Sequence, residues 1–300
     1  MKKLLSMSFA DVQDERGDFA AMDMAKKSGA DAIDFALFYQ SVTKEESVYT
    51  KGADAVCEYY RSVREYADKI GLKINQTHGR LSGFGITPER DVDFIKNSEY
   101  DILASNILGA KYCVVHTPAI THVGDGLTDD ELFGISDRLF SSILPFAKKY
   151  GIKIAAETHG DSRKYGKMEF FGHVENLVKC IERIEENFDG KGYMVICVDT
   201  GHTNLTVKYG LPTVEEAIRI MGSRIEVLHL HDNSGMRDEH KIVGTGTINF
   251  EEVFKALKEV GYSGYYNLEN NINHFGGGFE EEESAFCIKA LRHMLEVYGV

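Results

Sequence analysis

The stretch MVICVDTGHTN, residues 194–204, runs an apolar segment directly into a carboxylate and an imidazole. Residues 195–198 are apolar and predict a buried strand, and Asp199 and His202 follow at its end. A buried carboxylate is destabilising unless a cation or hydrogen-bond donors meet it. The sequence therefore predicts a source of positive charge or of donors at this strand end.

Seven other short apolar runs have the same form. Each of the eight runs is bounded by glycine or polar residues and is too short for a free-standing helix, which predicts strands at 4–9, 32–38, 73–78, 112–118, 153–159, 194–200, 225–232 and 264–270. Amphipathic segments lie between them, and the helical ones include residues 53–71, 129–151 and 280–299. Strand–helix alternation implies parallel strands with right-handed crossovers, and eight such units fit a closed barrel.

We therefore expect an α/β fold with a single (β/α)₈ TIM barrel domain over residues 1–300. No linker or low-complexity segment divides the chain. An open doubly wound sheet is the alternative fold. It is weakened because no glycine-rich phosphate-binding turn follows any of the expected strands.

Composition argues against several classes of function. The formal net charge of −13 is unfavourable for a surface that grips a nucleic acid backbone or an anionic membrane. No apolar run approaches the roughly 20 residues that span a bilayer, and no signal peptide is recognisable. The five cysteines are dispersed without a CxxC pair, which is typical of reduced thiols. We expect a cytoplasmic protein without membrane or nucleic acid partners, and a homo-oligomer remains open.

Imidazoles and carboxylates collect at the C-terminal ends of the expected strands, which meet at one rim of a barrel. They are His78, His116, Glu157, His159, Asp199, His202, His229, His231, Asp232 and Glu269, with Asp238 and His240 in the loop after residue 232. Such a set without thiols suits Mn²⁺, Fe²⁺, Co²⁺ or Zn²⁺. A divalent ion would also supply the cation that Asp199 requires.

Each of these residues also has a purely structural interpretation. A single buried histidine is more often a hydrogen-bonded core residue than a ligand, and Asp199 could cap a helix that follows it. The acidic runs at 129–131 and 280–283 are expected to be solvated helix starts. The metal interpretation depends on the same chemistry recurring at the ends of independent strands.

These motifs resemble those of the xylose isomerase-like barrel superfamily, which contains sugar isomerases and epimerases, inosose dehydratases and apurinic endonucleases. The matching motifs are AAETHG, VDTGH, HLHD and YNLEN, and the resemblance covers nearly the whole chain. It implies a shared metal site made of Glu157, Asp199, His229 and Glu269. His229 is chosen over His231 because the family motif reads His-x-x-acid, which matches His229 with Asp232.

Other motifs resemble further metal positions of the endonuclease branch, namely NQTHG, VVHTP and RDEH. The resemblance implies a set of additional metal or substrate ligands that comprises His78, His116, His202, His231, Arg237, Asp238 and His240. One ion is expected, and two or three remain open. The segment 231–250 resembles the isomerase and epimerase branch, which we favour.

That branch implies an enzyme acting on a sugar or a sugar phosphate by proton transfer through a metal-stabilised enediolate. Glu157 and Glu269 would then serve both as ligands and as the acid/base pair. The alternatives are an inosose dehydratase-like lyase, an apurinic endonuclease-like phosphodiesterase, a non-enzymatic sugar-binding barrel and a metal-free hydrolase. A phosphate on the substrate remains open, with Arg80, Arg163 and Lys208 as candidate contacts.

Overall fold

Each of the eight apolar runs predicted as strands forms one in the computed structural model, which describes residues 3–81, 83–119, 124, 126–162 and 167–300. The strands are β1 Leu5–Ser8, β2 Ala32–Ala36, β3 Lys73–His78, β4 Tyr112–His116, β5 Lys153–Glu157, β8 Met194–Asp199, β9 Ile225–His229 and β10 Tyr266–Leu268. They form one parallel sheet in the order β10-β1-β2-β3-β4-β5-β8-β9. A parallel bridge between Leu230 and Leu268 brings β9 against β10, so the barrel is nearly closed. The predicted (β/α)₈ fold is confirmed.

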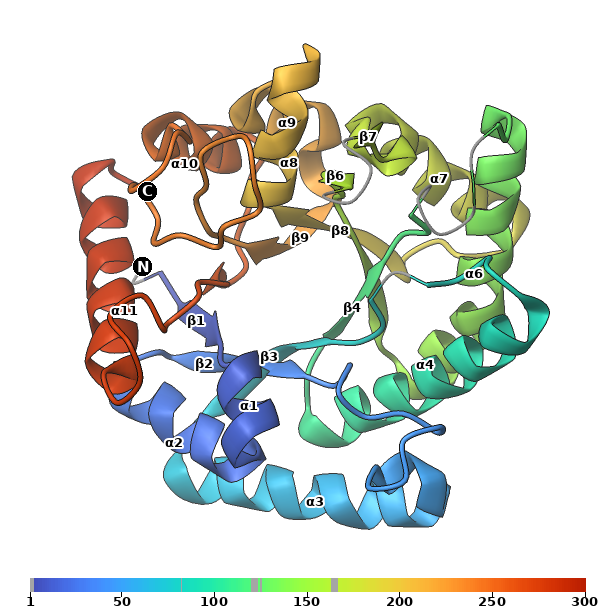
Figure 1. Cartoon of the computed structure of the whole chain (residues 1–300), viewed down its shortest axis with the longest axis horizontal. Helices are drawn as coiled ribbons and strands as arrows, with labels where there is room; N and C mark the ends of the chain where they lie inside the picture. The colour runs from blue at the N-terminus through green and yellow to red at the C-terminus, as the bar shows by residue number, and fades with distance from the viewer. Residues whose placement is uncertain (1–2, 82, 120–123, 125, 163–166) are drawn as a thin grey trace.

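Helices follow every strand and surround the barrel (Figure 1). They are α1 Ala10–Arg16, α2 Asp18–Ser28, α3 Ala53–Ile70, α4 Pro88–Leu108, α6 Asp129–Tyr150, α7 Val174–Asn187, α8 Thr200–Thr206, α9 Val214–Met221, α10 Phe250–Glu259 and α11 Glu280–Val297. Short 3₁₀ helices lie at Val48–Lys51, Phe170–Gly172, Val207–Tyr209 and Gly222–Arg224, and a small hairpin pairs β6 Asp161–Ser162 with β7 Lys167–Met168. None of the described helices has the length and apolar character needed to cross a membrane.

Helix boundaries follow local sequence signals. The side chain of Thr128 accepts a hydrogen bond from the backbone of Glu131, whose carboxylate returns the contact to Thr128, so α6 begins with a capping box. Gly71 and Gly151 end α3 and α6 in the left-handed conformation, which glycine adopts without steric cost. One expectation is only partly met. Glu281 and Glu282 at the start of α11 are exposed as predicted, but Glu280 and Glu283 are buried, where Arg16 pairs with Glu280 and His274 contacts Glu283.

The interior of the barrel divides into an apolar and a polar half. Strands β4, β5, β8 and β9 contribute the apolar interior cluster, which consists of Val114, Ala155, Val195, Cys197 and Val227. Strands β1, β2, β3 and β10 contribute the polar interior cluster, which consists of Ser6, Asp34, Gln76 and Asn267, all buried and connected by hydrogen bonds. The apolar half is the close-packed interior that is expected below a site at the C-terminal rim of such a barrel.

Candidate metal centre

Four strands deliver the central group of acidic and imidazole side chains. Glu157, Asp199 and His229 are the last residues of β5, β8 and β9, and Glu269 directly follows β10. One ligand atom from each of these four residues lies within 4.8 Å of those of the other three. Asp199 and His229 are fully buried, while 18% of the Glu269 side chain is exposed. The structure therefore brings together the four residues that the resemblance implied, and His229 is the histidine of this group.

Three carboxylates this close repel one another unless positive charge lies among them. Imidazoles supply part of it, because Glu157 Oε2 lies 2.8 Å from His116 Nε2 and Glu157 Oε1 lies 2.9 Å from His229 Nδ1. Burial raises the pKa of the Glu157 carboxyl, but His116 and His229 outweigh burial and hold that pKa well below its usual value. Burial lowers the pKa of His229, yet the surrounding acidic groups, which include Glu269 and Glu157, raise it well above its usual value.

Asp199 caps the helix that follows it, and it also faces the site. Its Oδ1 accepts a hydrogen bond from His202 N at 2.6 Å, so the helix-cap interpretation is confirmed. His231 Nε2 lies 2.9 Å and 3.0 Å from its two carboxylate oxygens. Burial raises the pKa of Asp199, but His202 and His231 outweigh burial and lower it below its usual value. The sequence predicted positive charge or hydrogen-bond donors around Asp199, and His202 and His231 supply part of them.

A second group lies on the loop side of the rim and contains His202, Asp238 and His240, whose ligand atoms also fall within 4.8 Å of one another. Asp238 Oδ1 is 3.3 Å from His240 Nε2, and its Oδ2 is 3.7 Å from His202 Nε2. His240 has a φ of 45°, which is uncommon for a residue with a side chain, and its Nδ1 lies 2.7 Å from the Glu269 carbonyl oxygen. Burial lowers the pKa of His240, but Asp238 raises it to about 9.

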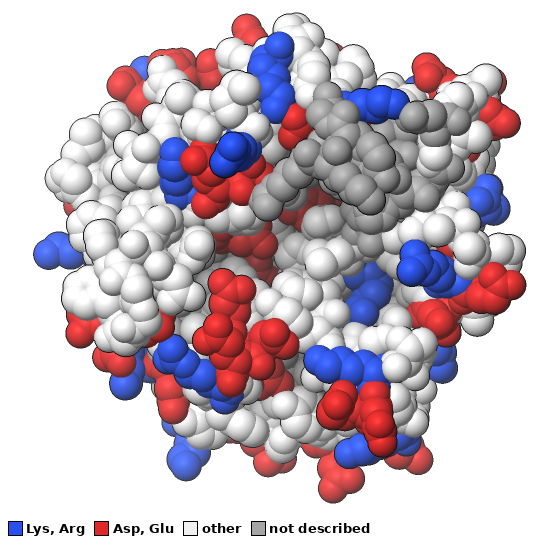
Figure 2. All heavy atoms as spheres, viewed as in Figure 1, with Lys and Arg blue, Asp and Glu red and all other residues white. Residues whose placement is uncertain are grey.

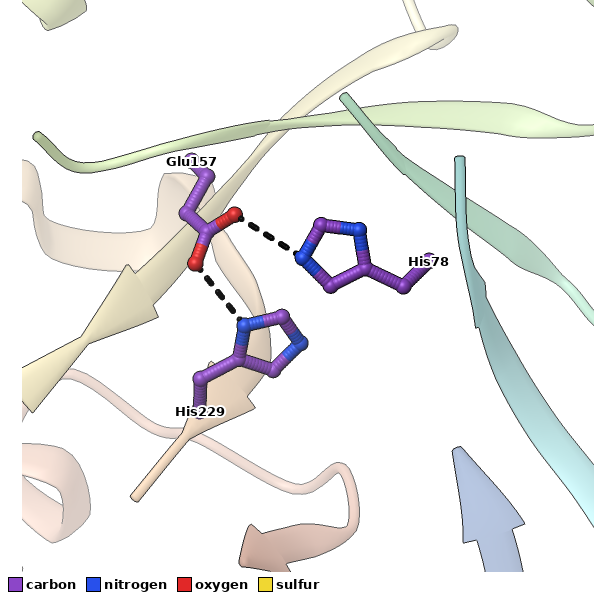
Figure 3. Close-up of side chains that lie close together, drawn as sticks. All are labelled: His78, Glu157 and His229. Atoms are coloured by element: carbon purple, nitrogen blue, oxygen red, sulfur yellow. Dashed lines mark hydrogen bonds and ion pairs between the residues drawn. The ribbon is translucent and has the colours of Figure 1, made fainter. Parts of the chain in front are cut away.

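Two other rim histidines, His78 and His231, complete two further groups. His78, Glu157 and His229 form one of them, and Figure 3 shows one oxygen of the Glu157 carboxylate directed to each ring, with His78 Nε2 at 3.4 Å from Oε2. His231 and His240 form the other with Glu269, and their rings stack with centroids 3.9 Å apart. Glu157, His229, His240 and Glu269 each belong to two groups. The rim therefore offers overlapping sets of ligand atoms.

The cationic residues that the sequence suggested for a substrate do not join these groups within the described residues. Arg237 is exposed. Arg80 is buried, with its Nε 2.6 Å from Asp101 Oδ2 and its other nitrogens on the Leu37 and Gln40 carbonyl oxygens, so its donors are occupied within the chain. Lys208 pairs with Asp161. Arg163 lies outside the residues that the structure describes.

Asp34, a fully buried carboxylate in the middle of β2, is not among the residues predicted from the sequence. Asp34 Oδ2 lies 3.1 Å from His229 Nε2, on the side of the ring away from Glu157. The signal was present, because AIDFALF places one charge in an apolar run just as residues 194–199 do. It was overlooked because Asp34 lies two residues before the end of its strand rather than at the end.

The donor set fits a divalent cation. The central group offers three carboxylates and one imidazole, the oxygen and nitrogen donors that Zn²⁺, Mn²⁺, Co²⁺ and Fe²⁺ accept. A cation among them would neutralise carboxylates that otherwise repel. A cavity of about 360 Å³ lies beside this group and shares Glu269 with it, and its lining also includes Phe9, Phe38, Tyr39, Asp238 and His240. Figure 2 shows this face of the barrel hollowed at its centre, with acidic atoms inside the hollow.

Comparison with known proteins places the chain in a family. Residues 22–290 match the family model of the xylose isomerase-like TIM barrel. The chain belongs to this family. An uncharacterized protein of Methanocaldococcus jannaschii is 32% identical over 164 residues, 54% of this chain and 52% of that protein. Inosose isomerase of Bacillus subtilis is 25% identical over 170 residues, 54% of each. The chain therefore matches about half the length of these relatives.

Several solved structures share the whole barrel with this chain. A D-tagatose 3-epimerase-like protein has a TM-score of 0.74 at 22% identity, covering 100% of this chain and 98% of that one. The IOLI protein with a bound zinc atom has a TM-score of 0.71 at 17% identity, covering 99% of this chain and 98% of that one. At these identities the similarity shows the fold alone.

Proposed function

We propose that this protein is a divalent-metal-dependent isomerase or epimerase that acts on a sugar by moving a proton next to a carbonyl group. The observation that carries the proposal is the convergence of Glu157, Asp199, His229 and Glu269 at the C-terminal rim, where Glu269 also lines a cavity. The family supports it, because proteins with this fold include a D-tagatose 3-epimerase-like protein and a zinc-bound one. The inosose isomerase relative agrees with a polyhydroxylated substrate.

Glu157, Asp199, His229 and Glu269 are the residues that would hold the ion. A divalent ion there would act as a Lewis acid, stabilising negative charge on a substrate carbonyl oxygen. His240 also lines the cavity, and its Nδ1 lies 2.7 Å from the Glu269 carbonyl oxygen.

Glu269 is suited to take or return the proton. Its side chain is partly exposed and lines the cavity, so it can reach a bound substrate. Glu157 comes from β5, which β8 and β9 separate from β10. Its oxygens contact His116 and His229, which favours the ionised form that a base requires. Two carboxylates on different sides of the substrate allow one to remove the proton and the other to return it.

The test follows solvent deuterium into free ketohexoses such as D-tagatose by NMR. We expect exchange in the metal-loaded wild type and a loss of at least about 100-fold in Glu269→Gln, the size that a positioned acid/base contributes. Glu226→Gln is the matched control, because Glu226 lies at the opposite end of the barrel, near the start of β9. Full exchange in Glu269→Gln, or exchange that a chelator leaves unchanged, would contradict the proposal.

A metal-dependent phosphodiesterase is the second candidate. The observation that favours it is the presence of further groups beside the central one, which give room for two or three ions. The net charge of −13 disfavours a polyanionic substrate. Incubating the zinc-loaded protein with a duplex that contains one abasic site distinguishes the two candidates. Nicking would support the phosphodiesterase, and an intact duplex together with sugar exchange would support the isomerase.

A further inference from the structure

We infer that Arg80 is a positioning residue of the substrate cavity: it fixes the turn that carries Phe38 and Tyr39, two aromatic residues of the cavity wall. The inference rests on the proposed function only in taking the cavity beside Glu269 as the sugar site. Phe38 and Tyr39 line that cavity together with Glu269. Arg80 is not among the described residues that line it, so its effect on a substrate is indirect.

Phe38 and Tyr39 are the two central residues of a tight turn that follows β2. Gln40 N donates a hydrogen bond to the Leu37 carbonyl oxygen at 3.0 Å, which closes the turn. The rings of Phe38 and Tyr39 lie with their centroids 4.4 Å apart, so the two side chains form one continuous aromatic surface. Aromatic walls with a few polar groups are typical of small-molecule sites. Where this surface lies depends on what holds the turn.

Arg80 binds the carbonyl oxygens at both ends of this turn. Its Nη2 donates to the Leu37 oxygen at 2.7 Å, and its Nη1 donates to the Gln40 oxygen at 2.8 Å. The donors of a guanidinium are fixed in one plane, so two points of the turn are held by one rigid group. The orientation of Phe38 and Tyr39, which lie between these two points, is thereby restricted.

The guanidinium is itself held by a helix of the barrel. Asp101, on α4, receives Arg80 Nε on its Oδ2 at 2.6 Å and Arg80 Nη2 on its Oδ1 at 3.0 Å. Tyr49 Oη also donates to Asp101 Oδ1, at 2.7 Å. Arg80 is 7% exposed and Asp101 1% exposed. The turn is therefore tied through a buried, bidentate pair to the helical framework.

A role in stability alone explains this arrangement less well. A buried ion pair adds little net stability, because the cost of removing both charges from water offsets their attraction. The turn is closed by its own hydrogen bond, and Phe38 and Tyr39 are partly exposed and do not belong to the buried core. What the two further bonds from Arg80 supply is a fixed position for these side chains. Phe38 also packs edge-on against the His78 ring, with centroids 5.2 Å apart, so it joins the cavity wall to the rim.

The experiment measures KM and kcat for deuterium exchange into D-tagatose by the zinc-loaded protein, in two backgrounds. One is the wild type, and the other carries Phe38→Leu and Tyr39→Leu together. Arg80→Lys keeps a positive charge opposite Asp101 but loses the planar fork that reaches both carbonyl oxygens. In the wild-type background it should raise KM about 10-fold with kcat nearly unchanged, the size of an aromatic contact that binds substrate and transition state alike.

In the background without the two aromatic rings, Arg80→Lys should leave KM unchanged, because Arg80 acts through them. Arg183→Lys is the matched control, since Arg183 pairs with Asp137 between α7 and α6. It should leave KM unchanged in the wild type. An unchanged KM in a folded Arg80→Lys, or an equal rise in both backgrounds, would overturn the positioning role.

A measurement on the wild type tests the hydrogen bonds even if Arg80→Lys fails to fold. In NMR spectra, the Arg80 Nη protons should exchange with water more slowly than those of Arg90, which is exposed. Equally fast exchange would overturn the inference. The proposed function can fail separately: a wild type that exchanges no deuterium into ketohexoses would contradict the reaction, while slow exchange of the Arg80 protons would still support the hold on the turn.

Discussion

The two ends of the barrel stabilise their acidic residues in different ways. At the N-terminal end, Glu226 accepts from Lys153 Nζ at 2.5 Å and from Tyr112 Oη at 2.7 Å, and 28% of its side chain is exposed. At the C-terminal rim, Glu157 and Asp199 are buried and their charged neighbours are imidazoles. Lysine keeps its proton near neutral pH, whereas an imidazole can release its proton and bind a metal. The N-terminal end is thus suited to stability and the rim to chemistry.

The largest expected effect comes from removing a carboxylate at the rim. Zinc at 1,000 times its Kd should raise the free energy of unfolding of the wild type by about 4 kcal/mol. Glu157→Gln should abolish most of that gain, because Glu157 belongs to two groups of ligand atoms. Glu226→Gln should preserve it. Thermal unfolding with zinc and with a chelator measures both variants. An equal zinc response in Glu157→Gln and Glu226→Gln would show that the rim carboxylate does not contribute more to zinc binding than the one at the N-terminal end.

An intermediate effect is expected from pH. Asp238 raises the pKa of His240 to about 9, and the pKa values of His202 and His229 lie well above usual. A raised histidine pKa stabilises the metal-free fold fully below the unfolded value of about 6.5, and that contribution is lost as pH rises through the folded value. The metal-free protein should therefore lose stability between about pH 7 and about pH 9.

Zinc should reverse this trend, because imidazoles must lose their protons to bind it. The gain in melting temperature on adding zinc should grow from about pH 6 to about pH 8, with protons released on binding. Calorimetric titrations in buffers of different ionisation enthalpy measure that release. A zinc response independent of pH would show that the rim imidazoles take no part in binding.

The smallest effect is expected at the N-terminal end. Glu226→Gln removes the charge that Lys153 and Lys111 share. Since Glu226 is partly exposed, the free energy of unfolding should fall by about 1 kcal/mol or less. The loss should be the same with and without zinc, and urea denaturation measures it. A loss that depends on zinc would indicate that the two ends are coupled.

The eight strands could be predicted from the sequence because each is a short apolar run with glycine or polar residues at its ends. Several end earlier than predicted, as β9 does at His229, because the residues that follow still resemble a strand. The gathering of acids and imidazoles at one rim followed from the parallel topology. The distances between them did not, since they depend on how the barrel closes. Asp34 could not be predicted because it lies inside its strand rather than at the end, and its partners Gln76 and Asn267 come from other strands.

The most direct test of the metal centre is anomalous diffraction from crystals of the protein loaded with zinc. The account predicts a peak within coordinating distance of Glu157, Asp199, His229 and Glu269. A map from a loaded crystal with no peak between these side chains, or with zinc bound only elsewhere, would contradict it.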